Sequence, residues 1–437
     1  MSDEHPVMLL YPDLSGLTRG RSIPSSQLND RLATGVGWVP ADQAITSLGP
    51  IAEPNPWGPI GDLRLVPDRA TEVHLDLWED AAPLHFLLCD AVTPDGAPWN
   101  ACVREMAKKA IRELEQAGYR ALVSFEQEFF LTGGPETPAP GFSMEAFRSA
   151  EPFPSLLLDA LVTAGLQPET LLPEYGANQF EITVQPTDPL GAADRAVAVR
   201  EVTREVARRL GRRATFTPIL DAEDVGAGVH VHVSLQDLHG NPVTYDAEQP
   251  AGLSEVAGSF AAGIIEHISA LCALTAPSVV SYARLTPHRW SAGYSILGDR
   301  NREAAVRICP TLTLGGGDPA TTFNLEYRPG DAAASPHMTL AAILLGGLSG
   351  IRNTRPTPPL VTADPHELTD AERDEVGAAR LPDSLGTALD ALEADPEVRA
   401  WFSDDLWDAY LSMKRTEIEL LTDVAFDEQC RRYRDVF

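Results

Sequence analysis

Residues 125–130 read Phe-Glu-Gln-Glu-Phe-Phe, so Glu126 and Glu128 lie two positions apart in an otherwise apolar stretch. Such a stretch is typical of a buried β-strand, in which side chains at i and i+2 point to the same face. Two like charges aimed at one place repel each other unless a cation or a proton lies between them. The motif predicts a strand that carries a divalent metal site, although two such glutamates alone more often mark a solvent-exposed face.

Two later segments carry further metal-ligand types in the same alternating pattern. Residues 226–234 read Gly-Ala-Gly-Val-His-Val-His-Val-Ser, which places His230, His232 and Ser234 on one face of a strand. Glu326 and Arg328 share a face in the segment 324–328. Neutral imidazole combines well with carboxylates as a metal ligand, although two alternating histidines are as often a structural pair.

The remaining polar motifs supply more carboxylates and three arginine elements. Glu174 and Glu181 flank a glycine-containing turn that leads into a strand. Arg284, Arg302 and Arg307 lie between the histidine segment and the segment that holds Glu326. Arginine recognises phosphate and carboxylate groups with two parallel hydrogen bonds. The order of these motifs therefore favours a site that handles charged phosphoryl or carboxyl groups with metal ions.

The spacing of apolar residues predicts a small sheet-rich domain over residues 1–95 and a larger domain over 96–437. The first holds short strand-like runs at 7–13, 61–68 and 71–78. The second begins with a helix that ends on Gly118 and then alternates strands with helices, which predicts an α+β fold. Its expected elements are strands at 119–131, 178–184 and 229–235 and helices at 101–118, 154–165, 192–210 and 253–274, with a charged helical region from about residue 381.

Global composition excludes several functions. The formal net charge of −29 disfavours nucleic acid and anionic membranes as partners. No apolar run approaches the ~20 residues of a membrane span, and the N-terminus is acidic where a signal peptide is basic. The five cysteines are scattered without a CxxC pair and are expected to be buried free thiols. We expect a cytoplasmic protein.

In this order, the motifs resemble the glutamine synthetase superfamily from near the N-terminus to the end of the catalytic region. The ordered set is ExE, E…GxxQxxE, GxGxHxHxS, SYxRL, NRxxxxR and ExR, together with DLSGLTRGRSIP, GDLRLVPD and RPGDAAASPHMTLAAILLGGLSGI. The resemblance implies a β-grasp-like N-terminal domain and a catalytic domain whose antiparallel sheet forms the active-site funnel. It also implies a dodecamer of two hexameric rings, with active sites between neighbouring subunits.

Residue by residue, the resemblance implies a role for each motif. Glu128, Glu174 and Glu181 look like ligands of the metal nearer the acid substrate, and Glu126, His230 and Glu326 like ligands of the metal nearer the nucleotide. The other residues that it marks are His232 and Ser234 for ATP; Arg284, Arg328 and Gly226 for the acid substrate; and Arg302 and Arg307 for the transferring phosphoryl group. The implied cofactors are ATP and two or more Mg²⁺ or Mn²⁺ ions.

The family chemistry agrees with this set of residues. A carboxylate is a poor electrophile, so ATP first converts it to an acyl phosphate, and an amine then displaces phosphate. Metal ions and arginines neutralise the charge on the phosphoryl oxygens. Arg302 and Glu326 are therefore expected to act in catalysis.

The sequence departs from the ammonium-using members at the amine site. Those members carry a glutamate six residues after the SYxRL arginine, where this chain has Trp290. An indole offers an apolar wall or a cation–π face but accepts no proton, although simple packing within its own loop is the plain alternative. Asp42 is only a loosely aligned candidate for the N-terminal aspartate of the ammonium site.

Two further departures concern the acid and the region before the histidines. Val225 replaces an asparagine that assists the α-amino group of glutamate, and Thr217-Pro218-Ile219-Leu220 replaces the FxPKP element. The sequence thus predicts a γ-glutamyl amide ligase that joins L-glutamate to an organic amine through γ-glutamyl phosphate. The alternatives are an ammonium-using glutamine synthetase and a catalytically silent regulatory relative.

Overall fold

The structure is a computed structural model that describes residues 4–134 and 139–437. Its smaller sheet is built only from residues near the N-terminus and has the order β2-β1-β6-β4-β3, with β5 paired to β6. β1 runs parallel to β6, whereas its hairpin partner β2 is antiparallel. The strands are β1 (Pro6–Pro12), β2 (Thr18–Pro24), β3 (Val36–Trp38), β4 (Leu63–Pro67), β5 (Val73–Leu75) and β6 (Leu84–Val92).

The larger sheet belongs entirely to the second part of the chain and has the order β15-β12-β13-β14-β11-β7-β9-β8, with β10 paired to β7. Its central pairs are antiparallel, as predicted, but β12 runs parallel to both β13 and β15 at one edge. The strands are β7 (Tyr119–Thr132), β8 (Pro168–Pro173), β9 (Gln179–Val184), β10 (Arg213–Thr215), β11 (Val229–Asp237), β12 (Tyr294–Asp299), β13 (Ala304–Ile308), β14 (Leu325–Tyr327) and β15 (Leu360–Val361).

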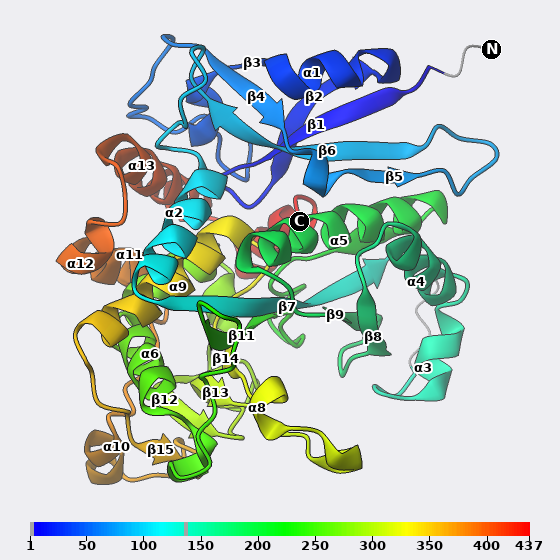
Figure 1. The fold of residues 1–437 in the computed structure, drawn as a ribbon. Coiled ribbons are helices and arrows are strands. Elements are labelled where there is room, and N and C mark those ends of the chain that lie inside the picture. Colours follow the sequence, from blue (N-terminus) through cyan, green and yellow to red (C-terminus); the bar gives the residue numbers. More distant parts are fainter. Residues whose placement is uncertain (1–3, 135–138) are drawn as a thin grey trace.

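Helices cover the larger sheet and separate it from the smaller one (Figure 1). α5 contacts β7 on one side and the 3₁₀ turn Arg69–Thr71 of the N-terminal domain on the other. The predicted α+β class is confirmed. The helices are α1 (Leu28–Thr34), α2 (Val103–Gln116), α3 (Met144–Ser149), α4 (Phe153–Thr163), α5 (Pro189–Arg209), α6 (Glu255–Glu266), α7 (Ile268–Thr275), α8 (Pro319–Thr322), α9 (Pro336–Arg352), α10 (Asp370–Val376), α11 (Leu385–Ala394), α12 (Pro396–Arg399), α13 (Asp404–Leu421) and α14 (Phe426–Arg434).

α2 and α9 form the centre of the helical layer. α2 buries Val103, Met106, Ala110 and Leu114, which recur at helical spacing, and it ends before Gly118, whose φ of +95° suits a residue without Cβ. α9 is buried over nearly its whole length and packs against both α2 and α6. A helix that is apolar on all sides is expected to be a core helix.

The predicted helix 253–274 is divided in two, which corrects the expectation of one continuous helix. α6 and α7 meet at His267 with a bend of 74°. His267 Nδ1 lies 2.6 Å from Asp395 Oδ2, and its Nε2 lies 3.3 Å from Ser349 Oγ. These distant partners hold the break, so periodicity alone could not reveal it. Across the described ranges, no single helix is long and apolar enough to cross a membrane, and only this bent pair passes such a test jointly.

Arg104 of α2 joins the N-terminal sheet to the helical layer through a buried ion network. Its guanidinium donates to Asp194 of α5 at 2.9 and 2.8 Å, to Asp90 of β6 at 2.8 Å and to Asp68 at 2.7 Å. His337 of α9 adds a 2.8 Å contact with Asp194. Because these residues come from both parts of the chain, the network fixes the N-terminal sheet against the catalytic helices. All five cysteines are free and buried, as predicted.

Candidate active site

The strand register brings the predicted ligands into one row across the large sheet. His230 of β11 pairs directly with Glu126 of β7, and His232 pairs with Glu326 of β14. On the other side of β7, Glu128 pairs with Glu181 of β9. Directly paired residues on adjacent strands point to the same face. Carboxylates that are far apart in sequence therefore meet because the central strands are antiparallel and in this register.

Glu126 lies at the centre of the row. His230 Nδ1 is 2.8 Å from Glu126 Oε1, and His232 Nε2 is 3.5 Å from Glu126 Oε2. Burial disfavours the Glu126 charge, but hydrogen bonds with both histidines hold its pKa well below the usual range. Ligand atoms converge within 4.8 Å in two groups, Glu126–His232–Glu326 and Glu126–Glu181–His230. Both groups contain Glu126, and the division of the ligands between two metal ions stays a prediction.

Glu128 and Glu181 are carboxylates whose charged forms are disfavoured by burial and by neighbouring carboxylates. Burial raises the pKa of Glu128 to about 8, helped by the charges of Glu174 and Glu126. Burial and the charges of Glu126 and Glu128 raise the pKa of Glu181 to about 10. Gln179 Nε2 and the Gly228 amide each donate to Glu128 Oε2 at 3.0 Å. A divalent cation would relieve this repulsion, so the donor set fits the metal that the motifs predict.

Glu174 follows β8 and lies at the edge of the cluster. Its Oε2 accepts a hydrogen bond from the Tyr175 amide at 3.0 Å. Burial raises its pKa, whereas the positive charge of Arg302 lowers it, so Arg302 lies on the same side of the site. Arg302 itself is exposed on the turn before β13.

Glu326 is almost completely buried between two arginines. Arg307 Nε donates to Glu326 Oε2, and Arg328 Nη1 donates to Glu326 Oε1. Burial opposes ionisation, but Arg328, the two histidines and Arg307 lower the Glu326 pKa to about 2. Glu326 therefore stays ionised and joins the arginine cluster to the metal-ligand row.

Arg284 is completely buried and faces the backbone. Its Nη2 donates to the Pro329 and Gly330 carbonyls at 2.6 Å each, while Nε has no partner among the described residues. A Cβ on Gly226 would lie 2.2 Å from Arg284 Cγ, so a glycine is needed where the arginine passes. In this conformation, Arg284 positions the 329–330 turn instead of reaching into open space.

Arg328 connects three parts of the site. Besides Glu326, it donates through Nε to the Arg302 carbonyl at 3.1 Å and through Nη2 to the Trp290 carbonyl at 2.6 Å. Trp290 has a φ of +55°, and the residue is 68% exposed. The loop is thus anchored by its backbone while the indole remains accessible.

Sequence reasoning missed a cavity of about 300 Å³ at the His232 end of the row. Ser234 Oγ donates to the Phe323 carbonyl at 2.8 Å, and Cys309 Sγ lies 3.7 Å from both His232 Nδ1 and Glu326 Oε2. No motif marks the apolar residues involved, because they come from separate loops. The lining includes Tyr245, Gly252, Arg300, Cys309, Pro310 and Phe323.

Asp42 lies away from this row. It occupies the 3₁₀ turn Pro40–Ala44 of the N-terminal domain, where burial raises its pKa and Arg19 and Arg21 lower it. Within residues 4–134 and 139–437, no side-chain contact joins it to the metal-ligand row. The structure of one chain therefore does not bring Asp42 together with the other predicted residues.

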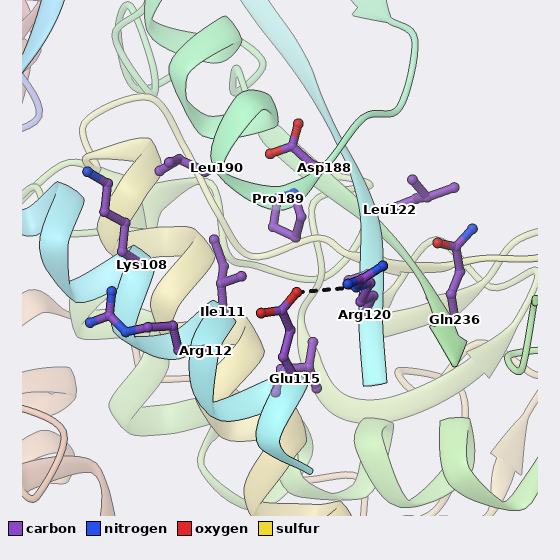
Figure 2. A pocket seen from close by; sticks show the side chains of 12 residues that line it. Lys108, Ile111, Arg112, Glu115, Arg120, Leu122, Asp188, Pro189, Leu190 and Gln236 are labelled. Atoms are coloured by element: carbon purple, nitrogen blue, oxygen red, sulfur yellow. Dashed lines mark hydrogen bonds and ion pairs between the residues drawn. The ribbon is translucent and has the colours of Figure 1, made fainter. Parts of the chain in front are cut away.

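A larger cavity of about 580 Å³ lies elsewhere, between α2, the start of α5 and the ends of β7 and β11 (Figure 2). Its rim carries the ion pair Arg120 Nε–Glu115 Oε1 at 3.2 Å. Lys108 and Arg112 also line it, but it contains none of the convergent carboxylates or histidines. We therefore place the candidate active site at the metal-ligand row and not in this larger cavity.

The fold and the site together define a two-domain α+β enzyme scaffold with a metal-ligand row and converging arginines on one sheet. Residues 3–99 match the glutamine synthetase N-terminal domain, and residues 100–433 match the glutamine synthetase catalytic domain. The chain belongs to the glutamine synthetase family, as the motifs predicted. It is an ATP-dependent ligase.

Similar proteins include a γ-glutamylpolyamine synthetase and several glutamine synthetases. A γ-glutamylpolyamine synthetase from Streptomyces coelicolor is 33% identical, with 98% of this chain and 93% of the relative covered. A glutamine synthetase from Pyrococcus furiosus is also 33% identical, with 92% and 87% covered. A crystal structure of a novel glutamine synthase homolog has a TM-score of 0.92 and 43% identity, covering 100% and 99% of the two chains. A GmaS complex with ADP has a TM-score of 0.83 and 25% identity, covering 98% and 96%.

Proposed function

We propose that this protein ligates L-glutamate to an organic amine at the expense of ATP and releases a γ-glutamylamide, ADP and phosphate. The observation that carries the proposal is the presence of an exposed indole, Trp290, in the loop anchored by Arg328, beside a full row of metal-ligand carboxylates. The relationship to a γ-glutamylpolyamine synthetase supports an organic amine as the nucleophile.

The metal-ligand row would hold two or more divalent ions. Glu126, Glu128, Glu174, Glu181, His230 and Glu326 are the proposed ligands, and His232 lies close enough to Glu126 and Glu326 to join them. Oxygen-rich sites with few imidazoles suit Mg²⁺ or Mn²⁺. When bound, these ions neutralise charge on phosphoryl oxygens.

The nucleotide is proposed to enter from the His232 end of the sheet. The 300 Å³ cavity there offers Tyr245 and Phe323 for an aromatic or apolar contact with a base, next to Ser234 and Cys309. Arg302 and Arg307 are the proposed partners of the transferring phosphoryl group. The γ-carboxylate of glutamate would then be converted to γ-glutamyl phosphate, which is the species that an amine attacks.

The acid substrate is proposed to lie between Glu174, Gly226 and the arginines. Arg284 and Arg328 are the proposed carboxylate-binding residues. Both donate hydrogen bonds to backbone carbonyls in this structure. A substrate carboxylate would replace these carbonyls as the hydrogen-bond acceptor. Since guanidinium–carboxylate contacts are stronger than contacts with neutral carbonyls, this exchange is favourable. Asp42 stays a proposed catalytic residue, and it would act in the active site of a neighbouring subunit.

The domain division, location and assembly are also proposals. We place the domains at 1–95 and 96–437, because every strand of the smaller sheet ends by Val92 and α2 begins at Val103. A dodecamer of two hexameric rings and a cytoplasmic location are proposed from family membership.

A panel of amines tests the proposed function. Phosphate release with ATP, Mg²⁺ and L-glutamate is measured with ammonium, methylamine, longer monoamines and polyamines, and the products are identified by mass spectrometry. We expect at least one organic amine to exceed ammonium in kcat/KM. A preference for ammonium over every organic amine would establish the glutamine synthetase alternative. ATP binding without phosphate release in any combination of acid and amine would establish the silent alternative.

A further inference from the structure

We propose that His5, His74 and His85 of the N-terminal domain form a second metal site, selective for Zn²⁺ and independent of the active site. Three neighbouring strands bring them together. His74 of β5 pairs directly with His85 of β6 in the antiparallel register. His5 immediately precedes β1, which runs parallel to β6 on its other side and pairs Met8 with Phe86. The β5–β6 hairpin and the start of β1 are adjacent in the N-terminal sheet (Figure 1).

The three imidazoles are already grouped at close range. His5 Nε2 lies 3.0 Å from His85 Nδ1. The ring centroids of His74 and His85 are 4.4 Å apart, and those of His5 and His74 are 5.4 Å apart. One ring nitrogen from each residue lies within 4.8 Å of the other two. Two nitrogens on one tetrahedral ion at about 2.0–2.1 Å lie roughly 3.3 Å apart, so modest side-chain rotations would complete the site.

A carboxylate sets the orientation of the buried ligand. His85 Nε2 lies 2.9 Å from Glu72 Oε1, which leaves Nδ1 facing His5. Metal-binding histidines usually donate their second ring N–H to such a carboxylate, which fixes the tautomer. Arg69 contacts the same carboxylate at 3.1 Å and holds it in place.

The backbone fixes the position of His5 although it lies near the chain terminus. The His5 amide donates to Ser25 Oγ at 3.3 Å, and the Ser25 amide donates to the His5 carbonyl at 2.9 Å. Two ligands are therefore positioned before an ion arrives. His74, which is exposed, supplies the third from the solvent side.

The donor set separates this site from the active site. Three imidazoles without a carboxylate ligand suit Zn²⁺, whereas Mg²⁺ requires mainly oxygen ligands. Three histidines leave the fourth tetrahedral position to water. A bound ion would clamp the β5–β6 hairpin to β1, so its expected role is to stabilise the N-terminal domain.

Zinc titration in excess Mg²⁺ tests the proposal on the full-length protein. Mg²⁺ occupies the oxygen-rich active site, and Zn²⁺ binding is followed by calorimetry, with the visible spectrum of tetrahedral Co²⁺ as a second readout. The variants are His74→Ala and Glu72→Gln. The matched control is His239→Ala, which removes another exposed histidine from the turn after β11.

We expect the wild type to bind one Zn²⁺ equivalent per chain, and the His239→Ala control to bind the same amount. His74→Ala should weaken this binding more than tenfold, and Glu72→Gln by about tenfold. Zinc should raise the Tm of the wild type but not that of His74→Ala, while phosphate release with Mg²⁺ should be the same in both. Wild-type protein that binds no Zn²⁺ under these conditions, or His74→Ala protein that binds it equally well, would overturn the proposal.

Discussion

Arg328 Nη2 donates to the backbone carbonyl of Trp290 at 2.6 Å, so the arginine that the motifs assign to the acid substrate also anchors the loop assigned to the amine. The same guanidinium contacts Glu326 and the Arg302 carbonyl. Lysine cannot reproduce three contacts in this planar arrangement. We expect Arg328→Lys to lower kcat/KM for both glutamate and the amine by roughly 10–100-fold, as for loss of one charged hydrogen bond of about 1.5–3 kcal/mol.

Steady-state phosphate release with each substrate varied in turn measures this effect. Arg431→Lys is the matched control, because Arg431 is exposed on α14 and pairs only with Glu428 and Asp435 among the described residues. A variant that loses affinity for glutamate but keeps its amine kinetics would show that the link to the Trp290 loop has no functional role.

The paired carboxylates predict a second outcome. Glu181 has neighbours of like charge, so its carboxylate is favourable only when a cation is bound beside it. Glu181→Gln should therefore reduce phosphate release by roughly a hundredfold or more without loss of folding. Glu419→Gln, on the exposed face of α13, should leave the rate unchanged. Circular dichroism and steady-state kinetics measure folding and rate. Near-wild-type turnover of Glu181→Gln would contradict the metal assignment.

His230 gives a third prediction because it contacts Glu126 at 2.8 Å and Glu326 at 3.6 Å, at the side of the row nearer the proposed nucleotide cavity. His230→Ala should weaken binding of metal–ATP by about tenfold or more and leave the affinity for glutamate nearly unchanged. Calorimetry with a non-hydrolysable ATP analogue and with glutamate compares the two. Equal weakening of both ligands would mean that His230 is placed at the wrong metal.

Side-chain alternation explains how far the sequence could predict this site. Glu126 and Glu128, or His230 and His232, fall on one strand face by the two-residue period alone. The pairing of His230 with Glu126 depends on the register between β11 and β7, which no local pattern encodes. For the same reason, the sharing of Glu126 between two ligand groups was not foreseen.

Long-range contacts account for the features that sequence reasoning missed or misplaced. The break at His267 depends on Asp395, which lies 128 residues further along the chain. Arg284 faces the 329–330 carbonyls because Gly226 lets its stem pass, a packing relationship between distant segments. Family motifs identified the arginines and carboxylates but could not show that Arg328 holds the Trp290 carbonyl.

The Arg104 network predicts an acid-dependent loss of stability. Burial opposes ionisation of Asp194, but Arg104 and His337 lower its pKa from 3.8 to about 2. Because the folded-state pKa is the lower one, the stabilisation is present above pH ~3.8 and is lost as the pH falls towards 2, by about 2 kcal/mol. Asp194→Asn should lower the urea midpoint at pH 6 and flatten its decline below pH 4.

Urea unfolding at pH 6 and pH 3 measures this slope, at a fixed protein concentration because the proposed assembly would make stability depend on concentration. Asp423→Asn, on the exposed turn after α13, is the control and should behave like the wild type. An Asp194→Asn variant with the wild-type pH slope would place the acid sensitivity elsewhere.

Trp290 carries the last prediction, which separates an amide ligase from an ammonium-using enzyme. An alkylammonium similar to lysine has a pKa of about 10.4, and only the neutral amine attacks, so an ammonium site needs negative charge to hold the cation and accept its proton. The exposed indole supplies neither, but it can cover the alkyl part of an organic amine at up to ~0.8 kcal/mol for each buried methylene. Trp290→Glu should therefore raise the kcat/KM ratio of ammonium to organic amine at least tenfold, with only partial gain of ammonium activity because Asp42 is only a loosely aligned counterpart of the ammonium-site aspartate. Val162→Glu, an equally exposed apolar position on α4, is the matched control and should leave the ratio unchanged. Competition between ammonium and the best organic amine, with both products quantified by mass spectrometry, decides the matter: a Trp290→Glu variant with the wild-type product ratio would reduce the indole to a loop residue without a part in amine selection.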